Sequence, residues 1–73
     1  MATVDVPAAM AGSICDVLVA VGDAVDEGQE VVVLESMKME IPVITEDAGT
    51  VKEILVKEKD PVAEGQVVAI LEE

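Results

Sequence analysis

The chain has 73 residues, which suits a single small domain, and 52% of them are hydrophobic although none is aromatic. Sixteen acidic residues against four basic ones give a formal net charge of −12. Such a surface repels phosphate backbones and anionic lipid, so nucleic-acid binding and membrane insertion are not expected. One cysteine cannot form an intramolecular disulfide, so tight turns and regular sheets have to stabilise an aliphatic core.

The cellular location follows from the N-terminal residues and the apolar segments. Residues 1–5 lack the features of a signal peptide, and no apolar run is long enough to span a bilayer. A low cysteine content is also what a reducing compartment leads us to expect. The sequence therefore predicts a soluble, cytoplasmic protein.

Short runs rich in β-branched residues recur along the chain, separated by Gly, Pro and Asp. This rhythm is typical of an all-β sandwich or barrel, and no segment has the periodicity of a sustained helix. Val25 and Val62, each isolated between two turn signals, predict one very short strand per half of the chain. Together with the longer runs they indicate a flattened barrel of about eight short strands. The longer predicted strands are residues 4–6, 13–19, 30–35, 39–44, 50–56 and 66–71.

An internal repeat organises the chain. Residues 11–36 align without a gap on residues 48–73, at an offset of 37 residues, and 12 of the 26 aligned positions are identical. Two copies are too few for a solenoid, so we expect them to complete one core around a pseudo-twofold axis within a single domain, residues 1–73. This symmetry relates the turn after the first copy to the chain termini, so the two should lie at opposite ends of the molecule.

The same turn residues occur in both copies. Gly28 and Gly65 lie in identical Glu-Gly-Gln tripeptides, where a glycine is expected to take a positive φ without a Cβ clash. Asp23 and Asp60 each precede a predicted two-residue strand, where a side-chain oxygen can accept hydrogen bonds from nearby backbone N–H groups. These four residues are interpreted as structural.

Lys38 lies between Met37 and Met39, in the short segment that joins predicted strands 30–35 and 39–44. Only a tight hairpin turn fits between these strands, so Lys38 is expected at or beside an exposed tip that can enter another protein's pocket. Flanking methionines are unusual in a turn, and the second copy has no apolar equivalent. The alternative is an ordinary lysine beside two methionines that fold back into the core.

Residues 35–40, Glu-Ser-Met-Lys-Met-Glu, resemble the attachment motif of biotinyl domains, the carriers of biotin-dependent carboxylases and decarboxylases. The resemblance extends over essentially the whole chain and implies a flattened barrel (barrel-sandwich hybrid) of two four-stranded sheets with internal quasi-twofold symmetry. The gapless repeat leaves no space for the thumb insertion of some acetyl-CoA carboxylase carriers, so the chain resembles thumbless members. The other matching residues are Gly28, Gln29, Pro42, Ala48, Gly49, Thr50, Val51, Asp60, Val62, Glu64, Gly65 and Gln66.

The resemblance implies a biotin carboxyl carrier without catalytic residues or a metal site. Biotin would be joined covalently to Lys38, with Met37 and Met39 as a recognition frame for partner proteins. Because a lysine amine is protonated at neutral pH, Lys38 would need a biotin protein ligase to attach biotin. The other implied partners are a biotin carboxylase, which charges the biotin, and a carboxyltransferase or decarboxylase, which takes the CO₂.

No functional role is predicted for the remaining nucleophilic side chains. Cys15 aligns with Lys52 of the second copy, so we expect a partly exposed thiol without a redox or metal-binding role. Lys52, Lys57 and Lys59 lack flanking methionines and are expected on the solvated surface.

Two other functions fit a domain of this kind. A lipoyl carrier of an oxo-acid dehydrogenase system would have the same fold, but its attachment lysine usually has polar neighbours, unlike Met37 and Met39. An unmodified barrel used for assembly, as in export-system adaptors, would carry a long helical insertion at the turn, and this sequence has none.

Overall fold

The computed structural model describes residues 2–73, so Met1, the first residue of the expected domain, lies outside it. Over the described residues the chain forms eight β-strands and no helix, which confirms the all-β prediction. In chain order the strands are β1 (Thr3–Pro7), β2 (Gly12–Val17), β3 (Ala24–Val25), β4 (Glu30–Ser36), β5 (Met39–Ile44), β6 (Gly49–Ile54), β7 (Pro61–Val62) and β8 (Val67–Glu72).

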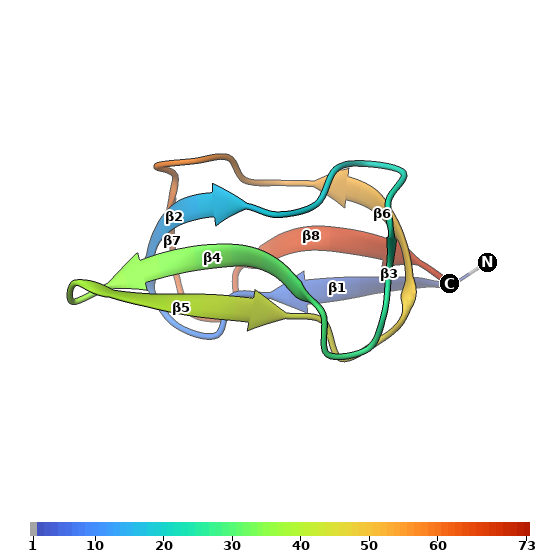
Figure 1. Cartoon of the computed structure of the whole chain (residues 1–73), viewed down its shortest axis with the longest axis horizontal. Coiled ribbons are helices and arrows are strands. Elements are labelled where there is room, and N and C mark those ends of the chain that lie inside the picture. Colours follow the sequence, from blue (N-terminus) through green and yellow to red (C-terminus); the bar gives the residue numbers. More distant parts are fainter. Residues whose placement is uncertain (1) are drawn as a thin grey trace.

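The strands form two antiparallel four-stranded sheets, ordered β1-β8-β6-β3 and β5-β4-β2-β7 (Figure 1). A shift of 37 residues carries each strand of one sheet onto a strand of the other: β1 onto β5, β8 onto β4, β6 onto β2 and β3 onto β7. The connecting hydrogen bonds repeat as well. Gly28 N–H donates to the Thr45 carbonyl at 2.8 Å, and Gly65 N–H donates to the Ala8 carbonyl at 3.0 Å. The flattened barrel with quasi-twofold symmetry is therefore confirmed.

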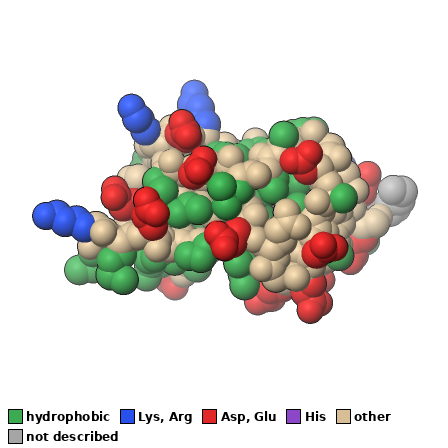
Figure 2. Space-filling model, viewed as in Figure 1, with side chains coloured by type: hydrophobic (Ala, Val, Ile, Leu, Met, Phe, Trp, Pro, Cys, Tyr) green, Lys and Arg blue, Asp and Glu red, His purple; other side chains and the backbone are tan. Residues whose placement is uncertain are grey.

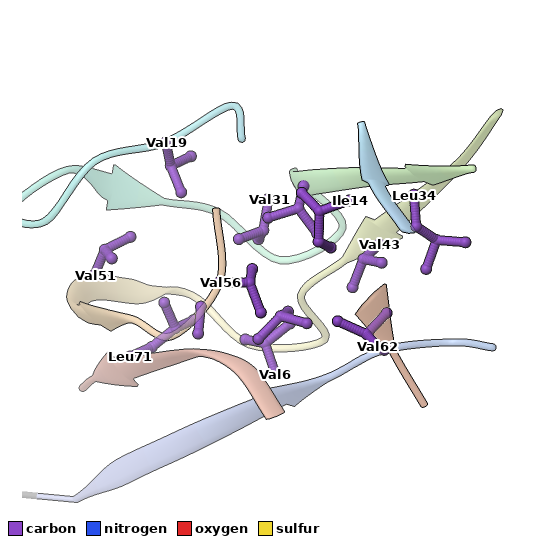
Figure 3. Packing of buried hydrophobic residues seen from close by; sticks show 14 of the residues in the cluster. Val6, Ile14, Val19, Val31, Leu34, Val43, Val51, Val56, Val62 and Leu71 are labelled. Atoms are coloured by element: carbon purple, nitrogen blue, oxygen red, sulfur yellow. The ribbon is translucent and has the colours of Figure 1, made fainter. Parts of the chain in front are cut away.

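The core lies between the two sheets and is built from aliphatic side chains, and Thr45 is the polar residue that is buried with them (Figure 3). Its centre is formed by equivalent residues of β4 and β8. Val31 and Leu34 of β4 and their counterparts Val68 and Leu71 of β8 are fully buried. Burying each such side chain contributes about 1.5–3 kcal/mol. Packing therefore fixes the central strands β4 and β8. The β4–β5 hairpin is rigid as well, because it continues directly from β4.

The strand register shifts at two places in each sheet, and one of the two is a β-bulge at equivalent places in β2 and β6. The register of β2 against β4 shifts between Ile14 and Asp16, which leaves Cys15 as the extra residue. The register of β6 against β8 shifts between Val51 and Glu53, which leaves Lys52 in the same position. A bulge bends its strand and increases the local twist, which helps so short a barrel to close.

The turns use the residues that the sequence predicts. Gly28 and Gly65 have φ values of 85° and 83°, in the left-handed region that favours glycine. The Asp23 carboxylate accepts the Ala20 N–H at 2.8 Å. The carboxylate of Asp60 accepts the equivalent Lys57 N–H at 3.0 Å. Both predictions, positive φ at the glycines and backbone contacts of the aspartates, are confirmed.

The equivalent turns before β3 and β7 differ in one backbone requirement. Gly22 has a φ of 96°, whereas Lys59, its counterpart, has a φ of 75°. A residue with a Cβ in this conformation costs about 1–2 kcal/mol, and glycine's extra unfolded-state entropy offsets only about 0.5–1 kcal/mol of that. Replacing Lys59 by glycine should therefore raise the free energy of unfolding by about 0.5–1 kcal/mol.

Urea unfolding at neutral pH measures this effect, and Lys57→Gly is the matched control. Lys57 belongs to the same turn but does not have a positive φ, so its replacement by glycine should lower the midpoint. A Lys59→Gly protein with a lower midpoint than the wild type would contradict the prediction.

Candidate functional site

The hairpin between β4 and β5 has a loop of two residues. The ladder runs from the pair Glu30 and Ile44 to the pair Ser36 and Met39, so only Met37 and Lys38 lie outside it. Their φ values are 54° and 65°. Positive φ at both central residues defines a type I′ turn, the kind whose twist matches the flanking strands. Lys38 therefore lies at the tip, as predicted.

This turn type ordinarily selects Asn-Gly or Gly-Gly, yet here both central residues carry long side chains. Met37 and Lys38 in the left-handed region each cost about 1–2 kcal/mol, which the packing of β4 and β5 must offset. Strain of this kind persists where the surrounding structure fixes the backbone, and it concentrates at functional sites. The hairpin therefore carries side chains that folding alone would not select.

The methionines of the turn point into solvent. Met37 is 90% exposed and Met39 is 64% exposed, and Lys38 between them is exposed as well. The alternative in which both methionines fold back into the core is therefore wrong. Two exposed, flexible and polarisable side chains form an apolar surface that different partners can contact. A primary amine at this tip is also placed as an amide-linked carrier group requires.

The base of the hairpin is acidic and is held by a third strand. Glu35 and Glu40 are directly opposite each other in the ladder, and like charges in such a pair disfavour strand pairing. Glu35 also pairs with Ser13 of β2. Beside it, Leu34 is fully buried, which anchors the strand in the core. The hairpin is thus a rigid projection with two carboxylates at its base (Glu35 and Glu40). Two exposed methionines, Met37 and Met39, form an apolar frame around Lys38 at its tip.

The two ends of the molecule are unequal although the fold is symmetric. The hairpin projects at the end opposite the chain termini, which confirms the predicted arrangement (Figure 1). At the termini, Glu73 N–H donates to the Ala2 carbonyl at 3.0 Å, in the place where the other half has its hairpin. Figure 2 shows the basic side chains of this face gathered at the hairpin end, while acidic side chains are spread along it. Partners that read charge can therefore distinguish the two ends.

The other nucleophilic side chains lie where the sequence predicts. Cys15, on the β2 bulge, is partly exposed. Partial burial raises the pKa of the Cys15 thiol, and the carboxylates of Glu40 and Glu35 raise it further. The thiol therefore stays protonated at neutral pH, where it is a weak nucleophile. The exposed lysines of the second half are Lys52, Lys57 and Lys59.

One feature near the hairpin is not predicted from the sequence. Cys15, Glu35, Glu58 and Lys59 line a common hollow, although they come from three separate segments. The sequence holds no local signal for this hollow, because its lining segments come together only in the folded chain. Within residues 2–73, no helix combines the length and the apolar character needed to cross a membrane.

Comparison with known proteins identifies the class that this fold and hairpin define. The family model described as "Biotin-requiring enzyme" matches residues 4–71. The chain therefore belongs to the biotin and lipoyl attachment family, and it is a biotinyl domain. The predicted family resemblance is confirmed.

Individual relatives agree with this assignment. The biotinylated protein TB7.3 of Mycobacterium tuberculosis is 55% identical over 40 residues, which cover 55% of this chain and 56% of the relative. The chain spans about half the length of the curated relatives it matches.

Among solved structures, part of the Kluyveromyces lactis urea carboxylase superimposes with a TM-score of 0.90 and 32% identity, covering 97% of this chain and 6% of that one. The lipoyl domain of the Azotobacter vinelandii 2-oxoglutarate dehydrogenase complex superimposes with a TM-score of 0.70 and 28% identity, covering 86% and 80%.

Proposed function

We propose that this domain is a biotin carboxyl carrier, with biotin joined by an amide to Lys38. The observation that carries the proposal is the exposed lysine at the tip of a strained two-residue hairpin, between two exposed methionines, in a member of the biotin-requiring family. Known relatives and structural neighbours support a biotin carrier role in carboxylase systems. We further propose that residues 1–73 form one carrier domain that works in the cytoplasm.

The residues of the chain bind and present the carrier group and leave the reactions to partner enzymes. Once attached, biotin supplies the ureido nitrogen that holds CO₂. The rigid β4–β5 hairpin keeps the attachment point away from the body of the domain, so that the arm can enter deep active sites (Figure 1). Tethering raises the effective concentration of biotin at each site, and this requires no catalytic residue in the domain.

The partners in this proposal follow from the chemistry of the hairpin. A biotin protein ligase must supply an activated biotin, because a free carboxylic acid does not form an amide with a lysine amine unaided. A biotin carboxylase then charges the biotin, and a carboxyltransferase or decarboxylase accepts the CO₂. Met37 and Met39 form the apolar frame that these proteins contact, and the negative base of the hairpin orients the approach.

The test is enzymatic labelling of the purified protein. Incubation with a biotin protein ligase, ATP and biotin should add one biotinyl group, and peptide mapping should locate it on Lys38 alone. Label on Lys52, Lys57 or Lys59, or a protein that stays unlabelled, would overturn the proposal.

A lipoyl carrier is the second candidate, because the fold also superimposes on a lipoyl domain with a TM-score of 0.70. The exposed methionines on both sides of Lys38 argue against it. The two groups differ in mass, so intact-mass measurement after parallel incubations with biotin and lipoate ligases separates them.

The two-residue turn also disfavours an unmodified assembly barrel, which would carry a long insertion there.

Met39→Thr is expected to separate recognition from stability. The Met39 side chain is 64% exposed at the end of β5, so its truncation should change the free energy of unfolding by less than about 0.5 kcal/mol. The rates of biotinylation or of carboxylation should change, because the apolar frame is altered. Urea midpoints and ligase kinetics measure the two effects. A large drop in the midpoint would show that Met39 packs as a core residue.

A further inference from the structure

A hollow of about 360 Å³ lies beside the base of the hairpin. Ile14 lies at its floor but is almost fully buried, so little of its aliphatic surface is open. A second hollow shares Glu58 with the first and adds the partly buried Val17, together with Val56 and Lys57. The first hollow is lined by Ser13, Ile14, Cys15, Glu35, Glu58 and Lys59.

The rim of the first hollow offers both kinds of hydrogen-bonding group. The Lys59 ammonium can only donate, and the carboxylates of Glu35 and Glu58 accept. A ligand that fits must therefore combine an apolar body with a neutral polar group that both donates and accepts. A cyclic urea fused to a thioether ring and joined to an alkyl chain has this composition.

Lys59 lines the hollow although its backbone conformation is one that non-glycine residues rarely adopt. Its φ of 75° lies in the left-handed region, and the equivalent turn in the other half uses Gly22 at 96°. Strain of this kind is tolerated where a side chain has a task. The opposite end lacks the matching set, because the counterparts of Cys15 and Glu58 are Lys52 and Val21. The hollow with its polar rim is thus specific to the hairpin end.

The side chain of Lys38, extended by biotin, is long enough to reach this hollow. Glu35 is on its rim and precedes Lys38 by three residues, a distance of about 10 Å along a strand. From the Lys38 Cα to the biotin ring there are about eleven bonds, and an extended chain advances about 1.2 Å per bond, which gives about 13 Å. The arm can therefore fold back along β4.

We propose that this hollow is a resting site for the biotinyl group carried by Lys38, an inference that rests on the proposed function. The Lys59 ammonium donates to the ureido oxygen, and the Glu58 carboxylate accepts from a ureido N–H. The alkyl chain and the thioether ring lie over Ile14 and the adjoining Val17. Between visits to partner enzymes the arm lies against its own domain, and it leaves when a partner binds the ring more tightly.

Cys15 provides a built-in reporter, because its thiol lines the hollow. Its alkylation by a maleimide is measured at one pH in the unmodified protein and in the fully biotinylated protein. An arm that occupies the hollow about three quarters of the time should slow alkylation about fourfold. Free biotin at the protein concentration should have no effect, because it lacks the effective concentration that tethering gives.

The pseudo-symmetry supplies the matched control. In the double variant Cys15→Ser, Lys52→Cys, the thiol occupies the equivalent bulge of the other sheet, at the far end from the hairpin. Its alkylation rate should be the same with and without biotin. In the Lys59→Gly variant, Cys15 should be alkylated at about the same rate in the unmodified and in the biotinylated protein, so the ratio of these two rates should be about one.

The outcomes separate the two proposals. If peptide mapping finds no biotin on Lys38, the proposed function and the resting site are both overturned. If Lys38 is fully biotinylated and the alkylation rate of Cys15 is unchanged, the resting site alone is overturned. An equal slowing at the introduced thiol of the double variant would overturn it too, because the effect would then not be local.

Discussion

Replacing Gly12 by alanine is expected to lower the free energy of unfolding by about 2–4 kcal/mol, a large share of the stability of a domain this small. A Cβ at position 12 would lie 2.5 Å from the carbonyl oxygen of Glu35 and 3.0 Å from the Leu34 Cδ1. The first contact is with backbone, which cannot rotate aside. Relief requires β2 and β4 to separate where Ser13 pairs with Glu35. The damage therefore falls at the base of the lysine hairpin.

Gly49 is the matched position in the other half. A Cβ there would lie 2.8 Å from the carbonyl oxygen of Glu72, so Gly49→Ala should also be destabilising, although somewhat less. Thermal or urea unfolding measures both losses. Under conditions where both variants are folded, Gly12→Ala should be biotinylated more slowly than Gly49→Ala, whose defect lies at the far end. A wild-type midpoint in Gly12→Ala would show that β2 and β4 approach less closely than the structure indicates.

The strands are predictable from sequence because each is a short β-branched run bounded by turn residues. Even the two-residue strands β3 and β7 follow from Val25 and Val62, since a buried valine between two turns has few other roles. The largest error is at the ends of β2 and β6, which stop at Val17 and Ile54, two residues before the predicted ends. The apolar pattern continues there because Val19 is buried in the core although it lies outside a strand.

The hairpin is predictable for a different reason: the spacing of the flanking strands leaves a two-residue turn, and the residues in it match a family motif. The sequence could not show that Gly12 touches the backbone of Glu35, because that contact depends on how two strands approach in space. It also could not show the conformation of Lys59, because lysine in a turn does not normally indicate a positive φ. Features that depend on the local sequence pattern can thus be predicted, whereas features that depend on how distant segments pack in space cannot.

Lys38→Arg is expected to reduce biotinylation by at least about a thousandfold, because a guanidinium stays protonated and is a far poorer nucleophile than an amine. The fold should be unaffected. Lys38 is exposed at the tip, so the free energy of unfolding should change by less than about 0.5 kcal/mol. Labelling with ligase and quantitation by intact mass measure the loss. Lys57→Arg, on the same end of the molecule, should be labelled like the wild type.

Lys38→Gly also removes the amine, but unlike Lys38→Arg it is expected to stabilise the fold. Glycine is the residue that the second central position of a type I′ turn prefers, and Lys38 has a φ of 65° there. The substitution should therefore raise the free energy of unfolding by about 0.5–1 kcal/mol while it removes the labelled amine. A variant that is more stable and unlabelled would show that the lysine is kept at a cost to folding. Residual labelling in Lys38→Gly would instead place the biotin on another lysine.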